Sequence, residues 1–246
     1  MAAPPLVGPP APLIGRAAAQ PDTPRIVAAM SMREQRGFTL WELMVAVAVA
    51  GVVLGIGIPS FREFQRNSAM ASAANELVTA ALLARAEAVK RQVPVTLCLS
   101  TSFDQASPAC DDAAAANSST AGFIVWVDES GPRDANGSPV ITDATDGNHE
   151  VDAGETEILR RSPPPGGAIT ISADAGFVTY MPSGYPRRPF DGRVVLFCDD
   201  RGNRAAAGQS SARAVRIDAT GRAQVFSEID DISAALADIG GGAACP

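Results

Sequence analysis

Apolar residues run from Phe38 to Ile58, and Glu42 is the only charged residue among them. At a rise of ~1.5 Å per residue, a helix of this length spans roughly 30 Å, the thickness of the hydrocarbon core of a bilayer. The pattern therefore predicts a membrane-spanning helix. A carboxylate costs on the order of 2.5 to 3.5 kcal/mol near the middle of a membrane, so we expect Glu42 to have a partner.

A helical pattern continues after Pro59. Apolar residues recur at steps of three or four residues, or multiples of them, at Phe61, Phe64, Ala71, Val78, Leu82 and Val89. Such a stripe is typical of a helix packed against a domain. We expect one helix from Phe38 to Arg91, ended by Pro94, with two separate helices as the alternative.

Beyond Pro94 the pattern changes to short runs rich in β-branched and aromatic residues, separated by Gly, Pro, Asp and Asn. The predicted strands are Val93–Ser100, Gly122–Glu129, Thr156–Arg161, Ala168–Ser172, Gly176–Pro182, Arg193–Cys198 and Ala212–Phe226. The last run contains a hairpin turn at Gly221, and Ile229–Ile239 has the apolar spacing of a short closing helix. Antiparallel sheets packed on the long helix follow from this order.

The residues before the apolar run give its orientation. Arg33 and Arg36 lie on its N-terminal side, so the positive-inside tendency keeps the leader in the cytoplasm and sends the chain after Pro59 across the membrane. Residues 1–29 are rich in Pro and Ala without any period, which is typical of a disordered head or of an upstream stretch that is not translated. Met30 and Met32 are the alternative starts.

No two of the four cysteines have CxxC spacing, and His149, the single histidine, is the one imidazole available as a metal ligand. Outside the cytosol, disulfides are favoured over zinc. Four cysteines allow three pairings, and we favour Cys98 with Cys110, closing a short loop, and Cys198 with Cys245, pinning the tail.

The stretch RGFTLWELMVAVAVAGVVLGIGIPSF resembles the N-terminal signature of type IV pilins and type II secretion pseudopilins. The resemblance implies that a membrane-embedded prepilin peptidase and methyltransferase cuts after Gly37 and methylates the new N-terminal amine of Phe38. It also implies a partner for Glu42, the Phe38 amine of a neighbouring subunit. Two charges that are each costly in hydrocarbon become cheaper as a pair.

The strand region is similar to minor pseudopilin H of type II secretion and to FimT-type minor pilins, through GFIVWVDESG, EILRR, FVTYMPSG, VVLFC and ARAVRIDATGRAQV. The resemblance implies an α+β, pilin-like fold, with a long N-terminal helix packed on antiparallel β-sheets. The expected parts are a leader, a transmembrane and assembly helix, the periplasmic half of the helix, and a globular β-rich domain, at 1–37, 38–58, 59–93 and 94–246.

This resemblance implies a minor pseudopilin of the type II secretion system, assembling into the periplasmic pseudopilus or its tip. The alternative is a FimT-type minor pilin that contributes to the initiation of type IV pili. In either case we expect one pass through the inner membrane, a C-terminal domain in the periplasm, and incorporation into the pseudopilus or pilus. The expected partners are other pseudopilins or minor pilins, the prepilin peptidase and the inner-membrane assembly platform.

Enzyme activity finds no support, because the sequence has no nucleophile elbow, HExxH or phosphate loop, and we expect no cofactor. His149, in a polar loop, is expected to be exposed. The acidic loop 132–157 offers oxygen ligands at Asp146, Asn148, Glu150, Asp152 and Glu157. Val151 stands where a calcium loop of the EF-hand type needs glycine, so a solvated insertion is favoured over a metal site.

DNA is the remaining candidate partner. The net charge of -7 excludes a basic nucleic-acid binder overall, but eight arginines lie between Tyr185 and Val225. Some FimT-like pilins take up DNA through a basic C-terminal motif, and here Gln224 stands in place of its second arginine. The candidate contacts are Arg213, Arg216 and Arg222, with scattered solvated arginines as the alternative.

Overall fold

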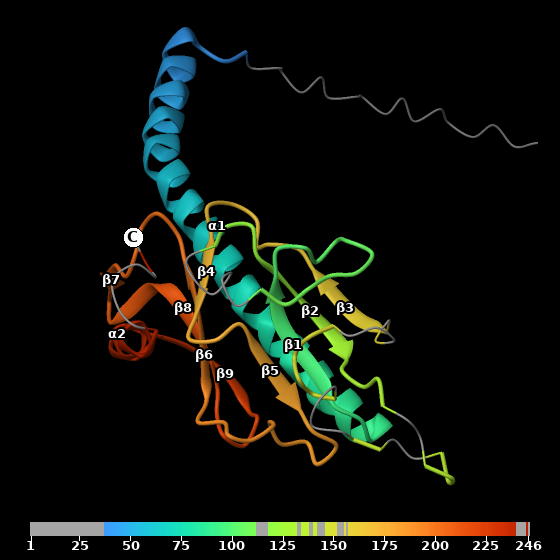
Figure 1. Ribbon diagram of the computed structural model, residues 1–246. Helices are drawn as coiled ribbons and strands as arrows, with labels where there is room; N and C mark the ends of the chain where they lie inside the picture. The colour runs from blue at the N-terminus through green and yellow to red at the C-terminus, as the bar shows by residue number, and fades with distance from the viewer. Residues whose placement is uncertain are drawn as a thin grey trace, which may run out of the picture. The chain divides into compact units, whose positions relative to one another are not determined.

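The computed structural model describes residues 37–111, 118–131, 134–137, 140–141, 146–151, 155, 157–239 and 245 (Figure 1). Residues 1–36 of the leader, with the candidate starts Met30 and Met32, lie outside these residues, as does Asp152 of the acidic loop. By its internal contacts the chain divides into two units, Met1–Ala50 and Gly51–Pro246.

Helix α1 spans Leu40–Arg91 and continues through Pro59, as the single-helix prediction expects. It ends where Gln92 adopts a left-handed backbone (φ 59°) and donates its N–H to the Ala88 carbonyl, an arrangement typical of helix C-termini. Arg91 pairs with Glu87 one turn earlier and with Glu157, at 2.5 and 2.7 Å, which ties the end of the helix to the chain just before Ile158.

The predicted buried stripe of α1 is wrong at four of its six positions, while Ala71 and Val78 are half-buried and Val78 packs against the core. Phe61, Phe64, Leu82 and Val89 are all exposed, with Phe64 at 67 %. The buried face consists mostly of alanines, namely Met70, Ala73, Ala74, Leu77, Ala80, Ala81, Ala84 and Ala88. Small side chains let a helix lie close to the strands it covers, so the packed face is the one without bulk.

Two antiparallel sheets pack on this alanine face (Figure 1). The first has the order β3-β2-β1-β5, from strands β1 (Val95–Ser100), β2 (Gly122–Val127), β3 (Ile158–Ser162) and β5 (Phe177–Tyr180). The second has the order β4-β6-β8-β9, with β7 also on β8, from strands β4 (Thr170–Ala173), β6 (Arg193–Cys198), β7 (Ala205–Ala206), β8 (Gln209–Ile217) and β9 (Ala223–Glu228). The prediction found every strand except the two-residue β7, with end points shifted by a few residues.

Alternation along the strands gives each sheet two buried faces. Towards α1 lie side chains such as Leu97, Val125, Phe197 and Val215. On the opposite face of the second sheet, Leu196 and neighbouring side chains pack against helix α2 (Ile229–Asp238) through Ile232 and Ala235. This helix is the predicted closing helix, one residue shorter than expected.

Candidate functional site

The N-terminus of α1 is closed by reciprocal hydrogen bonds between Thr39 and Glu42. The Thr39 N–H and hydroxyl both donate to Glu42 Oε2 at 3.0 Å, and the Glu42 N–H donates to Thr39 Oγ1 at 3.2 Å. This is a capping box, in which a threonine and a glutamate three residues later satisfy free N–H groups of the first helical turn. Glu42 therefore has a partner inside its own chain.

We did not predict this cap, although its signal is present in the sequence. Threonine followed three residues later by glutamate, just before an apolar run, is the usual signature of a capping box. Both contacts of the carboxylate reach Oε2. Among the described residues, no hydrogen bond reaches Oε1, so this oxygen of Glu42 can accept a further donor.

Phe38 and the first part of α1 carry large apolar side chains that no described residue covers. Phe38 is 87 % exposed and Val52 is 65 % exposed. The helix contains a stretch with a mean hydropathy of 2.3, long and apolar enough to cross a membrane, and none of that stretch is buried. We refer to residues 38–58 as the anchor segment.

The cysteines form the two pairs that the sequence analysis favoured, Cys98 with Cys110 and Cys198 with Cys245. Their Cα atoms lie 5.6 and 5.5 Å apart, the ordinary separation for a disulfide. Cys98 and Cys198 are both buried on the sheet faces turned away from α1, where each packs with its partner cysteine. The disulfides thus fasten the outer layers of the domain.

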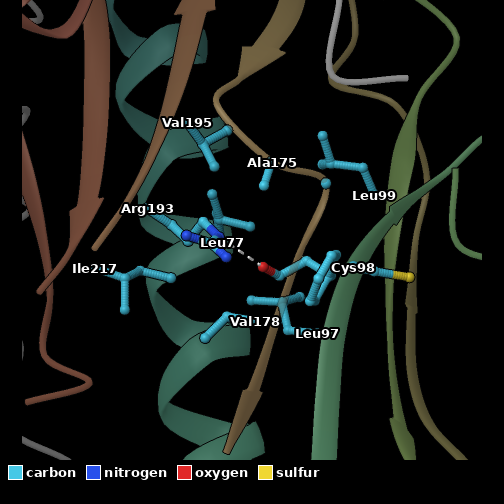
Figure 2. Close-up of a pocket in the computed structure, with 11 residues that line it drawn as sticks. Leu77, Leu97, Cys98, Leu99, Ala175, Val178, Arg193, Val195 and Ile217 are labelled. Atoms are coloured by element: carbon cyan, nitrogen blue, oxygen red, sulfur yellow. Dashed lines mark hydrogen bonds between the residues drawn. The ribbon is translucent and has the colours of Figure 1, made fainter. Parts of the chain in front are cut away.

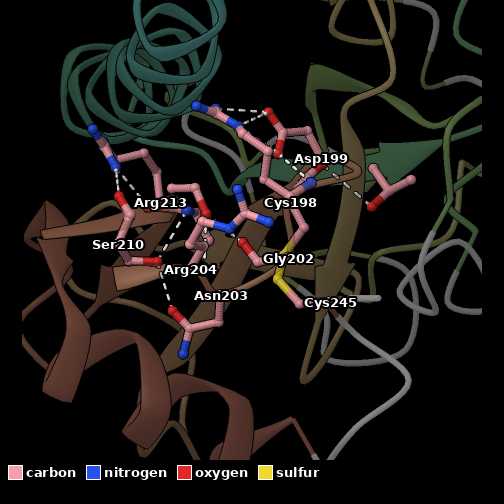
Figure 3. The surroundings of a disulfide bond; sticks show 12 residues. Cys198, Asp199, Gly202, Asn203, Arg204, Ser210, Arg213 and Cys245 are labelled. Carbon is pink, nitrogen blue, oxygen red and sulfur yellow. Dashed lines mark hydrogen bonds and ion pairs between the residues drawn. A yellow bond between two sulfur atoms is a disulfide. The ribbon is translucent and has the colours of Figure 1, made fainter. Parts of the chain in front are cut away.

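Next to the second disulfide, a charged cluster fastens the loop after β6 to α1 (Figure 3). Arg201 is half-buried, donates Nε and Nη2 to the Asp199 carboxylate at 2.9 and 2.7 Å, and donates Nη1 to Asn67 Oδ1 at 2.7 Å. Burial alone would raise the pKa of Asp199, but the hydrogen bonds and charge of Arg201 outweigh it and lower that pKa. These contacts use all three guanidinium nitrogens of Arg201, so the cluster has a structural role.

The candidate DNA contacts do not form one basic surface. Arg213 lies on the side of β8 that faces α1, while Arg216 lies on the α2 side and pairs with Asp238 at 3.0 Å. The Arg213 Nη1 donates to the carbonyls of Ser210 and Ala212, and burial lowers the pKa of this guanidinium. Arg222 is exposed at the β8–β9 turn. A role of these arginines in DNA binding stays a prediction.

Two carboxylates hold the acidic loop, that of Asp128 just before it and that of Asp146 within it. Asp128, fully buried, accepts the N–H groups of Gly147 and His149 at 2.8 and 3.1 Å, and burial raises the pKa of this carboxyl. Asp146 accepts the N–H groups of Ser130 and Gly131. Among the described residues, no three His, Cys, Asp or Glu side chains are grouped so as to hold a metal ion.

His149 is not the freely exposed side chain that we expected. It is half-buried, and its ring stacks on Phe177 at a centroid distance of 3.6 Å and an angle of 8°. The two residues are 28 positions apart, so no local sequence signal predicts the contact. The loop reaches β5 because the Asp128 carboxylate fixes the backbone on both sides of Asn148.

A small apolar cavity lies where the two sheets meet α1 (Figure 2). Leu77 of α1, Leu97 of β1, Val178 of β5 and Val195 of β6 line it, and its volume of about 20 Å³ suffices for a single water. Arg193 closes one side by donating Nε to the Phe177 carbonyl at 3.3 Å. The cavity is a packing defect too small to hold a substrate.

Comparison with known proteins agrees with this architecture. Residues 73–221 match the family model of the type II transport protein GspH, and residues 32–58 match the prokaryotic N-terminal methylation motif. The first match begins within the buried part of α1, ends at the β8–β9 turn and covers more than half of the chain. A search of curated proteins found no significant match.

Two solved structures are similar to this chain, both crystal structures of the type IV minor pilin FimU of Pseudomonas aeruginosa strain PAO1. Each is 18 % identical to it, with TM-scores of 0.40 and 0.35. The matches cover 66 and 63 % of this chain and 92 and 90 % of the FimU chains. On the strength of the family match, and with a methylation motif preceding the sheets, this chain belongs to the GspH family of type II transport proteins.

Proposed function

We propose that this chain is a minor pseudopilin of the type II secretion system, a structural subunit of the periplasmic pseudopilus or its tip. The observation that carries the proposal is the GspH match across the sheet domain, joined in one chain to the methylation motif. The exposed anchor segment supports it, because apolar side chains with no cover in the single chain need lipid or neighbouring subunits. The proposed role is assembly, and catalysis belongs to the processing peptidase.

The proposed processing creates the charge that Glu42 needs. Cleavage after Gly37 frees the Phe38 amine, which becomes a cation at the start of the anchor segment and is then methylated. In an assembled filament, the Glu42 Oε1 left open by the capping box accepts this amine from a neighbouring subunit. The pair lowers the cost of placing either charge in hydrocarbon and fixes the register between subunits.

The proposed location follows from the same segment. The precursor spans the inner membrane once, with its basic leader in the cytoplasm and its sheet domain in the periplasm. The two disulfides support an oxidising compartment for that domain, because disulfides persist there and are rare in the cytosol. The proposed partners are other pseudopilins, the prepilin peptidase and methyltransferase, and the inner-membrane assembly platform.

Three substitutions separate the two contacts of Glu42. Glu42→Gln keeps a side chain that can cap the helix but removes the charge, so we expect it to abolish co-purification with other pseudopilins and to reduce secretion. Thr39→Ala removes the cap but keeps the charge, and we expect assembly to persist. Glu63→Gln removes an exposed carboxylate elsewhere on α1 and serves as the control.

The same three variants can also contradict the proposal. If Glu42→Gln assembles like the control while Thr39→Ala fails, the carboxylate serves the helix cap alone. An anchored domain with no filament partner would behave in the same way for all three variants. Correct membrane insertion of each variant, checked by resistance to alkaline extraction, keeps a loss of assembly from being confused with a loss of the protein.

The alternative function is a FimT-type minor pilin that contributes to the initiation of type IV pili and to DNA uptake. It shares the anchor segment and the sheet domain, so the contacts within the chain favour neither system. Deleting the protein distinguishes them. Loss of exported proteins with normal pili supports the pseudopilin, whereas loss of surface pili with normal export supports the minor pilin.

A further inference from the structure

A second, larger cavity of about 270 Å³ lies beside the edge strand β5. The loop around His149, the strand itself and the segment from Arg187 to Arg193 form its walls. Three of its lining residues are arginines, Arg187, Arg188 and Arg193, and none is an aspartate or glutamate. In a chain with a net charge of -7, this is a local concentration of positive charge. We call it the arginine pocket.

The arginine pocket is organised before any ligand arrives. The Arg193 guanidinium lies 4.9 Å from the centre of the Phe190 ring and 5.7 Å from that of Phe177, within the range of cation–π contacts. Its Nε and Nη1 donate to the carbonyls of Phe177 and Gly192. Arg187 donates Nη1 to the Asp146 carbonyl at 2.6 Å. These contacts fix two of the three cations, which lowers the entropy cost of binding.

Two of these cations lack a counter-charge within the part of the chain that the structure describes. Arg188 and Arg193 contact no carboxylate there. The domain's other arginines often do have one, as the ion pairs of Arg91, Arg160, Arg201 and Arg216 show. Arginine binds planar oxyanions with paired hydrogen bonds, and aromatic walls exclude water from such bonds. An anion is therefore the kind of ligand that these side chains suit.

We propose that the arginine pocket binds the carboxylate of an acidic segment of a protein partner. A cavity of about 270 Å³ is smaller than typical sites for drug-sized ligands. Its size suits one acidic side chain and the residues next to it in a peptide. Single-stranded nucleic acid needs a basic groove that follows the backbone over several nucleotides. The exposed Glu150 and Asp191 adjoin the pocket in sequence, and Arg213 and Arg216 face opposite sides of β8, so the described residues offer no such track.

This inference does not depend on whether the chain serves secretion or pili. It is tested with the full-length protein in detergent micelles, by calorimetric titration with the blocked peptide acetyl-Gly-Glu-Phe-Glu-Gly-amide. The same peptide with glutamine in place of both glutamates is the matched ligand control. Arg188→Gln is the test variant because Arg188 is exposed, so its loss leaves the fold intact. Arg204→Gln removes another exposed arginine, one that does not line the pocket.

We expect the glutamate peptide to bind and the glutamine peptide to bind at least about tenfold more weakly, because charge-assisted bonds exceed neutral ones by about that factor. Arg188→Gln should weaken binding by about the same factor, and Arg204→Gln should leave it unchanged. Absence of binding at low salt, or equal binding to Arg188→Gln, would overturn the proposal. So would tighter binding of a thymidine oligonucleotide, or binding of inorganic phosphate as tight as that of the peptide.

Discussion

Helix α1 contains two apolar regions that behave in opposite ways. The anchor segment carries Val, Leu, Ile and Trp side chains, and all of its residues are exposed in the single chain. Between Met70 and Ala88 the same helix is buried through alanines. Among the described residues, the most apolar part of α1 is thus exposed, while its mildly apolar part belongs to the core. Burial in the domain follows how closely a helix face can approach the sheets. We propose that the bulky side chains of the anchor segment contact lipid or neighbouring subunits.

The largest expected effect comes from removing the disulfide that closes the longer loop. Cys198 and Cys245 are 47 residues apart, and closing a loop of that length restricts the unfolded chain by about 4 kcal/mol. For Cys98 and Cys110, 12 residues apart, the same relation gives about 3 kcal/mol. Replacing each pair by alanine should lower the free energy of unfolding of the domain in that order. Membrane insertion, measured by alkaline extraction, should not change. Loss of insertion in either variant would show that the anchor segment depends on the domain.

Two leucines on opposite sides of α1 give the second test. Leu77 is buried against both sheets and Leu82 is 54 % exposed. Leu77→Ala should lower the free energy of unfolding by about 2 to 5 kcal/mol, through lost burial and the cavity left behind. Leu82→Ala should change it by no more than about 0.5 kcal/mol, as at other surface positions. Denaturant unfolding of the full-length protein in micelles measures both. Equal effects would mean that the alanine face is not the packed face.

The reverse substitution tests the alanines directly. Ala84 is fully buried, whereas Ala50 lies in the anchor segment and is exposed. Ala84→Leu forces extra volume between helix and sheets and should destabilise the domain by about 1 to 3 kcal/mol. Ala50→Leu is the matched control and should leave domain unfolding unchanged. A tolerated leucine at position 84 would contradict close helix–sheet packing as the reason for alanine.

The smallest expected effect is a change in acid sensitivity. Since Arg201 lowers the pKa of Asp199 in the folded state below its ordinary 3.8, the unfolded chain takes up this proton first as pH falls. The stabilisation from this ion pair is therefore complete above about pH 4 and is lost as pH falls through the lowered pKa. Asp199→Asn should flatten the acid side of the stability profile, and the exposed Asp191→Asn should not. A steeper acid side in Asp199→Asn would refute the contact.

Much of this fold could be predicted from sequence because its signals are local. The change from helical spacing before Pro94 to short β-rich runs after it gave the order of elements, and the hairpin at Gly221 separates β8 from β9 as expected. The disulfide pairing also agreed, since each pair follows from loop closure along the chain. The capping box of Thr39 and Glu42 had a local signal as well, although the carboxylate was interpreted only as an assembly group.

The features that sequence reasoning missed depend on contacts across the fold. Phe61, Phe64, Leu82 and Val89 dominate any apolar stripe drawn on α1, because alanine carries too little hydrophobic signal to outweigh them. The buried face is chosen by the sheets that cover it, which a helical pattern alone does not contain. The arginine pocket combines a loop, an edge strand and a turn whose residues lie far apart in sequence. The sequence shows the arginines themselves, but it does not show that the fold brings three of them to one pocket.

The central claim is that the chain matures by cleavage after Gly37 and assembles through the anchor segment that begins at Phe38. The most direct measurement is the mass and N-terminal sequence of the protein purified from membranes of cells that contain the prepilin peptidase. The account predicts a chain that begins with Phe38 and carries one methyl group on its N-terminal amine. A chain that still begins at Met1, Met30 or Met32 would contradict it, because Glu42 would then have no new amine to meet.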